Sequence, residues 1–441
     1  MTRALPHVPA ALLAATAALL VLAACDRDSA SAPAGASVSP RASAAAIAAG
    51  PRTPAADDGR FSIRVAGNQL VDASGKAVQL RGVNVSGLEF VAIQGWNPTN
   101  PWGGQTGTDT PQWNTLKTWG INAVRLPLNE ASWLGLSCVS VGGSGAVVVD
   151  GAKVENKRGG TVKADPGGNY VATVKSSVAG ATEAGLYVIL DLHWSAPGEV
   201  CPMTQNAMAD ADHSLDFWSS VATAFREYPS VLFELFNEPT LPSKRANWTI
   251  LRDGGMQDAV LTGGDPFQVS FGWQVAGMQQ MLDAVRATGA KNVVLVAGLN
   301  YAGDLSRWLD YRPVDSLQQL GAVWHSYPTY HSVWGTAGYL IPNAGLSTWS
   351  DAEQILAAGF PLVVTEYGDR NTPGTVGAPF VSHLLPWADR NGVGYLGWAW
   401  AVAQNPDNVL ITNSAGDPTS GYGEYVLAHY RCRAKGTAEC P

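Results

Sequence analysis

The stretch Leu235-Phe236-Asn237-Glu238-Pro239 decides how the rest of this 441-residue chain is interpreted. It ends an apolar, β-branched and aromatic run, which predicts a buried strand of a parallel sheet. Pro239 has no backbone N–H to donate to a neighbouring strand. The strand should therefore stop before it, with Asn237 and Glu238 at the carboxyl end.

The position of these two polar residues suggests a site. Ligands bind at the carboxyl edge of α/β sheets, and a carboxylate beside an amide there suits acid–base chemistry on a sugar. The alternative is an ordinary surface glutamate in a strand-to-loop turn. The other strands and motifs of the chain have to distinguish the two.

Seven further strand-like runs accompany this one, and helix-like segments alternate with them. The eight expected strands are residues 78–85, 123–128, 187–192, 231–236, 293–297, 322–325, 362–365 and 394–398. Strand–helix alternation predicts the α/β class, with a parallel sheet and right-handed crossovers. Eight strands predict that this sheet closes into a (β/α)8 TIM barrel. An open doubly wound sheet is the alternative, but it would usually carry a glycine-rich phosphate turn after an early strand.

Local patterns add detail to this barrel. Residues 61–78 are expected to form a short hairpin before the first barrel strand. Three long loops, residues 137–168, 240–267 and 332–347, follow strand ends. They should therefore overhang the same, carboxyl-terminal face of the barrel, where loops commonly carry function.

The N-terminal segment resembles an export signal. The apolar run 10–24 follows Arg3 and is short for a membrane span. The Leu-Ala-Ala-Cys that ends at Cys25 resembles the lipobox of bacterial lipoproteins, which implies removal of residues 1–24 and lipidation of Cys25. A plain secretory signal cleaved near the same place is the alternative.

The mature chain divides into a tether and a catalytic domain. Residues 25–58 are almost all Ala, Ser, Pro, Gly and Asp, and cannot bury enough apolar surface to offset the entropy of ordering. We expect a flexible tether there and the catalytic domain over residues 59–441. The protein is accordingly expected in the bacterial cell envelope as a lipoprotein, or secreted.

Composition limits the partners. The formal net charge is −8 and the isoelectric point is about 5.4, without a run of Lys or Arg. Nucleic acid is therefore an unfavourable partner, and contact with a membrane is expected only through the N-terminal lipid. We expect a monomer that needs no cofactor or metal.

Cysteine usage fits an oxidising compartment. Cys138, Cys201, Cys432 and Cys440 remain after Cys25, an even number with three pairings open. The first two lie in loops after neighbouring strands and the last two lie close together in the C-terminal tail, so we expect the pairs 138–201 and 432–440. Zinc is the weaker alternative, because no Cys-x-x-Cys spacing exists.

A second carboxylate completes the chemistry. Glu366 ends the expected seventh strand, as Glu238 ends the fourth. Tips of strands around one barrel mouth can face each other despite their distance in sequence. Two carboxylates that flank a bond are the machinery of glycoside hydrolysis, in which one protonates the leaving oxygen and the other attacks the anomeric carbon or activates water.

From residue 61 to the C-terminus the chain resembles glycoside hydrolase family 5, the cellulase family with the 4/7 barrel arrangement. The motifs that carry the resemblance are Leu80-Arg81-Gly82-Val83-Asn84, Val124-Arg125-Leu126-Pro127, Leu190-Asp191-Leu192-His193-Trp194, Asn237-Glu238-Pro239, His325-Ser326-Tyr327, Thr365-Glu366-Tyr367-Gly368 and Gly397-Trp398. The resemblance implies that Glu238 is the acid/base and Glu366 the nucleophile. The three long loops depart from compact members of the family and leave the substrate open.

The remaining matched residues are expected to bind substrate or to support the two glutamates. Arg125 and the Tyr327 hydroxyl are suitable donors to an ionised Glu366. Asn237 is expected to bind the sugar 2-hydroxyl. The other three expected substrate-binding residues are His193, His325 and Trp398. For Arg125, the two histidines and Trp398, a structural role in an ion pair or in the core is the alternative, and Trp400 is the better candidate for core packing.

These observations predict a retaining endo-β-1,4-glucanase that acts on polysaccharide or oligosaccharide. A mannanase, xyloglucanase or other β-glycanase on the same scaffold is the enzyme alternative. A non-catalytic carbohydrate-binding lipoprotein is the alternative from a different class, and the complete pair of glutamates argues against it.

Overall fold

The computed structural model describes residues 61–94, 100–108, 110–136, 139–142, 145–147, 168–198, 200–202, 204–241, 244–257, 272–327, 349–369, 380–402, 408–437 and 439–441. All of these residues belong to one compact unit. The expected segments 1–24 and 25–58 and most of the three long loops lie outside the described residues. Within the described residues, no helix combines the length and apolarity needed to cross a bilayer.

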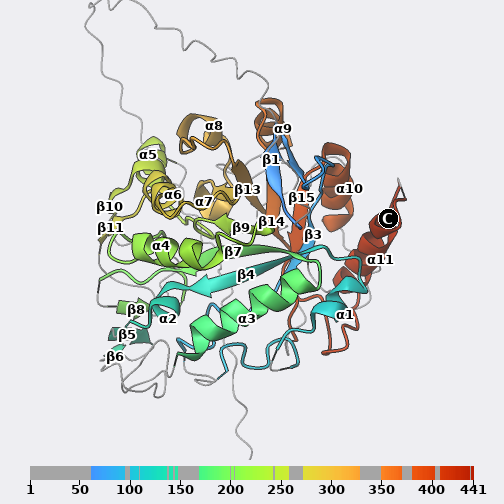
Figure 1. The fold of residues 1–441 in the computed structure, drawn as a ribbon, viewed down its shortest axis with the longest axis horizontal. Helices are drawn as coiled ribbons and strands as arrows, with labels where there is room; N and C mark the ends of the chain where they lie inside the picture. Colours follow the sequence, from blue (N-terminus) through green and yellow to red (C-terminus); the bar gives the residue numbers. More distant parts are fainter. Residues whose placement is uncertain are drawn as a thin grey trace, which may run out of the picture. The chain divides into compact units, whose positions relative to one another are not determined.

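Eight parallel strands close into a barrel, in the order β12-β13-β14-β15-β3-β4-β7-β9. The closed sheet and the helices around it (Figure 1) confirm the predicted TIM barrel. The barrel strands are β3 (Arg81–Asn84), β4 (Ala123–Asn129), β7 (Tyr187–Trp194), β9 (Val231–Glu234), β12 (Val294–Ala297), β13 (Leu320–Ser326), β14 (Leu362–Tyr367) and β15 (Gly394–Gly397).

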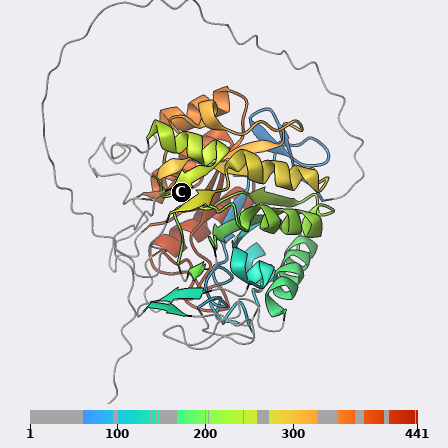
Figure 2. The ribbon, with the colours of Figure 1, turned by 90° about the vertical axis from the view of Figure 1, so that its left-hand side faces the viewer.

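Helices lie outside the barrel strands, as the two views in Figures 1 and 2 show. They are α1 (Trp113–Lys117), α2 (Glu130–Leu134), α3 (Asn169–Glu183), α4 (Ser214–Phe225), α5 (Arg245–Asp253), α6 (Met278–Ala287), α7 (Leu299–Ala302), α8 (Trp308–Tyr311), α9 (Trp349–Ala357), α10 (Val381–Asn391) and α11 (Tyr422–Ala434). In α4 and α6 one apolar stripe at helical spacing is buried against the barrel.

The fourth barrel strand ends at Glu234, two residues before the predicted end. The backbone does not leave the sheet there, because the N–H groups of Leu235 and Asn237 still donate to the carbonyls of Leu295 and Leu192, at 3.1 and 3.0 Å. The polar residues that follow are therefore held at the barrel mouth by irregular hydrogen bonds rather than by a regular ladder.

The hairpin before the barrel consists of β1 (Arg64–Ala66) and β2 (Gln69–Val71), paired antiparallel. The N–H of Val78 donates to the carbonyl of Leu70, so this residue belongs to the hairpin. The first barrel strand consequently begins at Arg81, later than predicted.

Two small sheets come from the loops between barrel strands. One pairs β10 (Gly255–Gln257) with β11 (Trp273–Val275). The other joins β5 (Val139–Gly142), β6 (Gly145–Val147) and β8 (Val200–Pro202). Of these strands, β5, β6 and β10 lie within the expected loops 137–168 and 240–267, where no strand was predicted.

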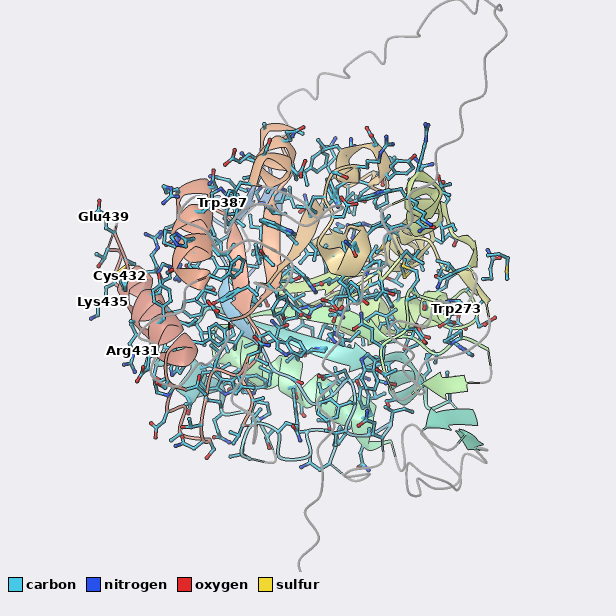
Figure 3. All side chains as sticks on the ribbon, turned by 180° about the vertical axis from the view of Figure 1, so that it is seen from behind. Trp273, Trp387, Arg431, Cys432, Lys435 and Glu439 are labelled. Atoms are coloured by element: carbon cyan, nitrogen blue, oxygen red, sulfur yellow. A yellow bond between two sulfur atoms is a disulfide. The ribbon has the colours of Figure 1, made fainter. Side chains whose placement is uncertain are left out.

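Cys432 and Cys440 form a disulfide with their Cα atoms 5.7 Å apart, which is the pair expected from the C-terminal tail. Cys432 lies on α11, at the edge of the molecule in Figure 3. Cys138 lies outside the described residues and only the backbone of Cys201 is described, so their pairing stays a prediction.

Candidate active site

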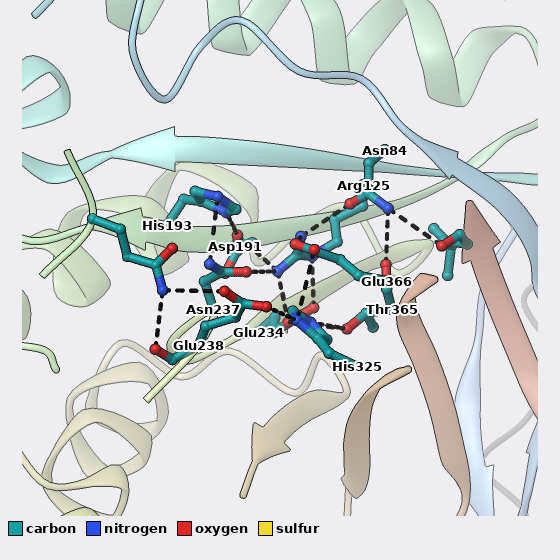
Figure 4. A network of polar contacts seen from close by, with 12 residues as sticks. Asn84, Arg125, Asp191, His193, Glu234, Asn237, Glu238, His325, Thr365 and Glu366 are labelled. Carbon is teal, nitrogen blue, oxygen red and sulfur yellow. Dashed lines mark hydrogen bonds and ion pairs between the residues drawn. The ribbon is translucent and has the colours of Figure 1, made fainter. Parts of the chain in front are cut away.

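The carboxyl ends of the barrel strands bring seven of the eight expected site residues into one polar network. Figure 4 shows this network from close by and labels all of them except Tyr327. Its members come from five strands or the segments that follow them: Arg125 from β4, His193 from β7, Asn237 and Glu238 after β9, His325 from β13, Tyr327 after β13 and Glu366 from β14. The eighth residue, Trp398, follows β15 and joins through its ring contact with His193.

Arg125 is the centre of this network and is fully buried. It donates through Nε and Nη2 to both oxygens of Glu234, at 3.0 and 2.8 Å. Its Nη1 donates to Glu366 Oε1 at 2.6 Å, and its Nη2 lies 2.9 Å from Asp191 Oδ2. Burial opposes its charge, but the charges of Asp191, Glu234 and Glu366 outweigh burial and raise the pKa of Arg125. The guanidinium is thus the shared partner of three buried carboxyl groups.

Glu366 receives the two donors that were expected from the sequence. Arg125 binds Oε1, and the Tyr327 hydroxyl donates to Oε2 at 2.8 Å. The side chain is 6% exposed. Two charge-assisted hydrogen bonds on different oxygens hold this carboxylate in one orientation.

Glu238 lies near Glu366, and 13% of its side chain is exposed. His325 Nδ1 is 2.9 Å from its Oε1. One oxygen of Glu238, one oxygen of Glu366 and one ring nitrogen of His325 all lie within 4.8 Å of one another. The two carboxyl groups are therefore close neighbours.

His325 lies between these two glutamates and is buried. Burial lowers its pKa, but the charge of Glu366, the proximity of Glu234 at 3.8 Å from Nε2 and the contact with Glu238 outweigh burial and raise the pKa to about 10. A protonated ring donates from both nitrogens, to Glu238 and to Thr365 Oγ1 at 3.1 Å. His325 is therefore a cation at neutral pH and unsuited to bind a metal ion.

His193 has the opposite character. Burial, followed by the charge of Arg125, lowers its pKa. Its Nδ1 lies 2.6 Å from Asp191 Oδ2 and carries the hydrogen, so Nε2 accepts from the Asn237 amide at 3.4 Å. Trp398 stacks on this neutral ring, with centroids 5.7 Å apart and planes inclined by 13°.

The two tryptophans near the C-terminal barrel strand differ in burial. Trp398 is partly exposed, and its peptide bond to Ala399 is cis. Trp400 is 2% exposed and packs edge-on against Trp119, at 5.0 Å between ring centroids. Trp400 therefore packs in the core as expected, and the role of Trp398 in binding substrate stays a prediction.

Sequence reasoning missed Asp191 and Glu234 as members of the site. Each is fully buried on a barrel strand. The sequence contained a signal for them, because a charged residue inside an apolar strand needs a buried partner of opposite charge. Arg125 also lies inside an apolar strand and could have been recognised as that partner. The residue missed without any signal is Gln205, whose amide donates to the carbonyl of Glu238 at 3.0 Å.

A second group of potential metal ligands, Glu130, Asp210 and His213, also lies within 4.8 Å. The oxygens of Glu130 already accept hydrogen bonds, from the N–H of Ala196 at 2.9 Å and from the Ser214 hydroxyl at 2.5 Å. Burial, then the charge of Asp210, raises the pKa of Glu130 well above its usual value. This chemistry suits a carboxyl–carboxylate pair better than a cation site.

The family described as Cellulase (glycosyl hydrolase family 5) matches residues 71–404. Endoglucanase N of Pectobacterium atrosepticum is 22% identical over 350 residues, which cover 79% of this chain and 58% of that protein. An endoglucanase of Clostridium saccharobutylicum is 21% identical over 369 residues, covering 83% and 62%. The chain thus spans less than two thirds of the length of these relatives.

Solved structures share the fold. A β-mannanase from Streptomyces thermolilacinus has a TM-score of 0.53 and 20% identity, over 86% of this chain and 98% of that one. A β-glucanase from Saccharophagus degradans has the same TM-score and identity, over 86% and 94%.

Proposed function

Because the chain belongs to the cellulase family, glycosyl hydrolase family 5, we propose that it hydrolyses β-1,4-glucan by double displacement. The observation that carries the proposal is the close approach of the Glu238 and Glu366 carboxyl groups at the barrel mouth. Spacings of about 5–5.5 Å belong to retaining enzymes, and larger ones leave room for the water of an inverting enzyme.

The contacts suggest a role for each glutamate. Glu366, held by Arg125 and Tyr327, attacks the anomeric carbon. Glu238 is the more exposed of the two and protonates the leaving oxygen, then takes a proton from water in the second step.

Neighbouring residues are suited to hold the sugar. Asn237 binds the 2-hydroxyl, a contact that strengthens in the transition state. Trp398, partly exposed and stacked on His193, is suited to contact a sugar ring.

Glucan is favoured as the polymer because the relatives named above are endoglucanases. A mannanase, xyloglucanase or other β-glycanase is the alternative, since one of the similar folds is a β-mannanase. A screen of soluble β-glucan, mannan, xylan and xyloglucan with product analysis separates these substrates. Activity on mannan alone would replace glucan in the proposal without changing the chemistry.

We expect the first product to keep the β-configuration at its anomeric carbon, because two inversions restore it. Proton NMR during the first minutes of hydrolysis of a soluble oligosaccharide detects the anomer before mutarotation. An α-anomer as first product would contradict double displacement, and turnover of no β-glycan at all would contradict the proposed function.

We also propose that the protein is exported and anchored through Cys25, on the support of the lipobox-like sequence. Cys25→Ser should then leave the membrane fraction and keep its specific activity, because the lipid would be attached outside the catalytic domain. Fractionation and mass spectrometry of the N-terminus test this. A wild-type protein that is unlipidated contradicts the anchor.

A further inference from the structure

A segment of residues 204–212 lies between β8 and α4 and reaches the active site. It is held at the barrel mouth on two sides. On one side, the N–H of Thr240 donates to the carbonyl of Ala207 at 3.0 Å. On the other side, the Ser195 hydroxyl donates to the carbonyl of Met208 at 2.9 Å. The segment therefore bridges the loop after β7 and the loop that carries Glu238.

A buried acidic pair fixes the far end of the segment. Asp210 is fully buried, and its Oδ2 accepts from the N–H of Ala196 at 3.0 Å, beside Glu130. The N–H of Ala211 donates to the carbonyl of Gln274 at 2.8 Å. Anchors on three different loops make this segment a rigid support for the residues near its start.

Gln205, near the start of this segment, makes two contacts with Glu238. Its amide nitrogen lies 3.0 Å from the main-chain carbonyl of Glu238 and 3.4 Å from the side-chain Oε2. His325 contacts the other oxygen, Oε1, at 2.9 Å, a contact drawn in Figure 4. Donors on two different oxygens restrict rotation of the carboxyl group about its last single bond.

Other charges also act on Glu238. His325 on β13 is a cation in contact with it, and Glu366 on β14 lies 3.7 Å from the same ring nitrogen. Charge interactions also link Glu238 with Asp191 and His193 on β7. These groups are present whether or not Gln205 donates, so a change at Gln205 alone is a clean test of its own contribution.

We propose that Gln205 is a positioning residue that orients the Glu238 carboxyl group for proton transfer to the leaving oxygen. This inference rests on the proposed function. An acid catalyst must direct its proton at the leaving oxygen. A carboxyl group that rotates freely spends less time in this orientation than one that is held by hydrogen bonds. A donor on Oε2 also interacts more strongly with the ionised carboxylate than with the protonated acid.

The test uses two aryl glycosides that differ in their need for an acid, 2,4-dinitrophenyl and phenyl β-cellobioside. For Gln205→Ala, kcat/KM on the phenyl substrate should fall about tenfold or more, because its leaving group needs protonation. On the dinitrophenyl substrate kcat/KM should stay within about twofold of the wild-type value, since general acid help matters little there.

The pH profile gives a second readout. The alkaline limb of kcat/KM on the phenyl substrate should move up by roughly half a unit in Gln205→Ala, since a donor to the carboxylate is lost. In Gln205→Glu the limb should move further, because a second carboxylate faces the first. A merely structural role for Gln205 would not move this limb.

The matched control is Asn206→Ala. Asn206 is the buried neighbour in the same segment, and its amide donates away from Glu238, to the carbonyl of Ser195 at 3.3 Å. This variant should lower thermal stability, with the ratio between the two substrates and the alkaline limb unchanged. Equal losses on both substrates, or an unmoved limb, in the Gln205 variants would overturn the inference. A wild-type enzyme that cleaves neither substrate nor any β-glycan would instead count against the proposed function.

Discussion

Glu238→Ala is expected to release a burst of phenol from an aryl glycoside with a good leaving group, and then to stall. Such a leaving group barely needs the acid, so Glu366 still forms the glycosyl-enzyme. The second step needs Glu238 as a base, and its absence traps the intermediate. Added azide should restore turnover, because azide attacks without a base. Stopped-flow absorbance follows the burst, and mass spectrometry detects the trapped intermediate.

Glu366→Ala should show neither a burst nor an intermediate, because the nucleophile itself is missing. On polymer both variants should be nearly inactive, since general acid–base help alone is worth about 10²–10⁴-fold. Glu227→Ala, at a side chain that is 80% exposed, is the control for expression and handling. A burst from Glu366→Ala and none from Glu238→Ala would reverse the two roles, and full activity in both would place the chemistry elsewhere.

Arg125→Met is expected to be the most destabilising change at the site, by about 3–5 kcal/mol. It removes the cation that faces Asp191, Glu234 and Glu366 and leaves three buried carboxyl groups without their shared partner. Chemical denaturation followed by circular dichroism gives the free energy of unfolding. Activity should also be lost, because Glu366 loses one of its two donors.

The pH dependence of this loss has a definite sign. In the wild type, burial raises the pKa of Asp191 well above its usual value, although the charge of Arg125 lowers it. Without Arg125 the folded state should bind protons still more readily than the unfolded state, so lowering the pH should shrink the difference from the wild type. Arg252→Met, which breaks an exposed pair with Asp253, should cost less than about 1 kcal/mol at any pH. A deficit for Arg125→Met that grows as pH falls would contradict the assignment.

The order of strands and helices was readable from the sequence because burial imposes it. A strand covered on both faces must be largely apolar along its length, as in β7 and β9, and a helix that packs on a barrel must carry an apolar stripe, as in α4. The positions of Glu238 and Glu366 at the ends of such strands followed from the same pattern. Strand ends were less readable, because the backbone after Glu234 continues in irregular hydrogen bonds.

Local patterns in the chain were thus enough to predict the barrel and the two glutamates at its mouth, since periodic burial and strand ends are properties of short segments. The other site residues followed from the motifs shared with glycoside hydrolase family 5. Apart from the two donors to Glu366, the partners of those residues were not predicted in this way. Arg125 meets Asp191 and Glu234 on other strands of the barrel, and Gln205 reaches Glu238 from a separate loop. Barrel closure and loop packing create these contacts between residues far apart in sequence, because charges and hydrogen bonds act through distance in space and not along the chain.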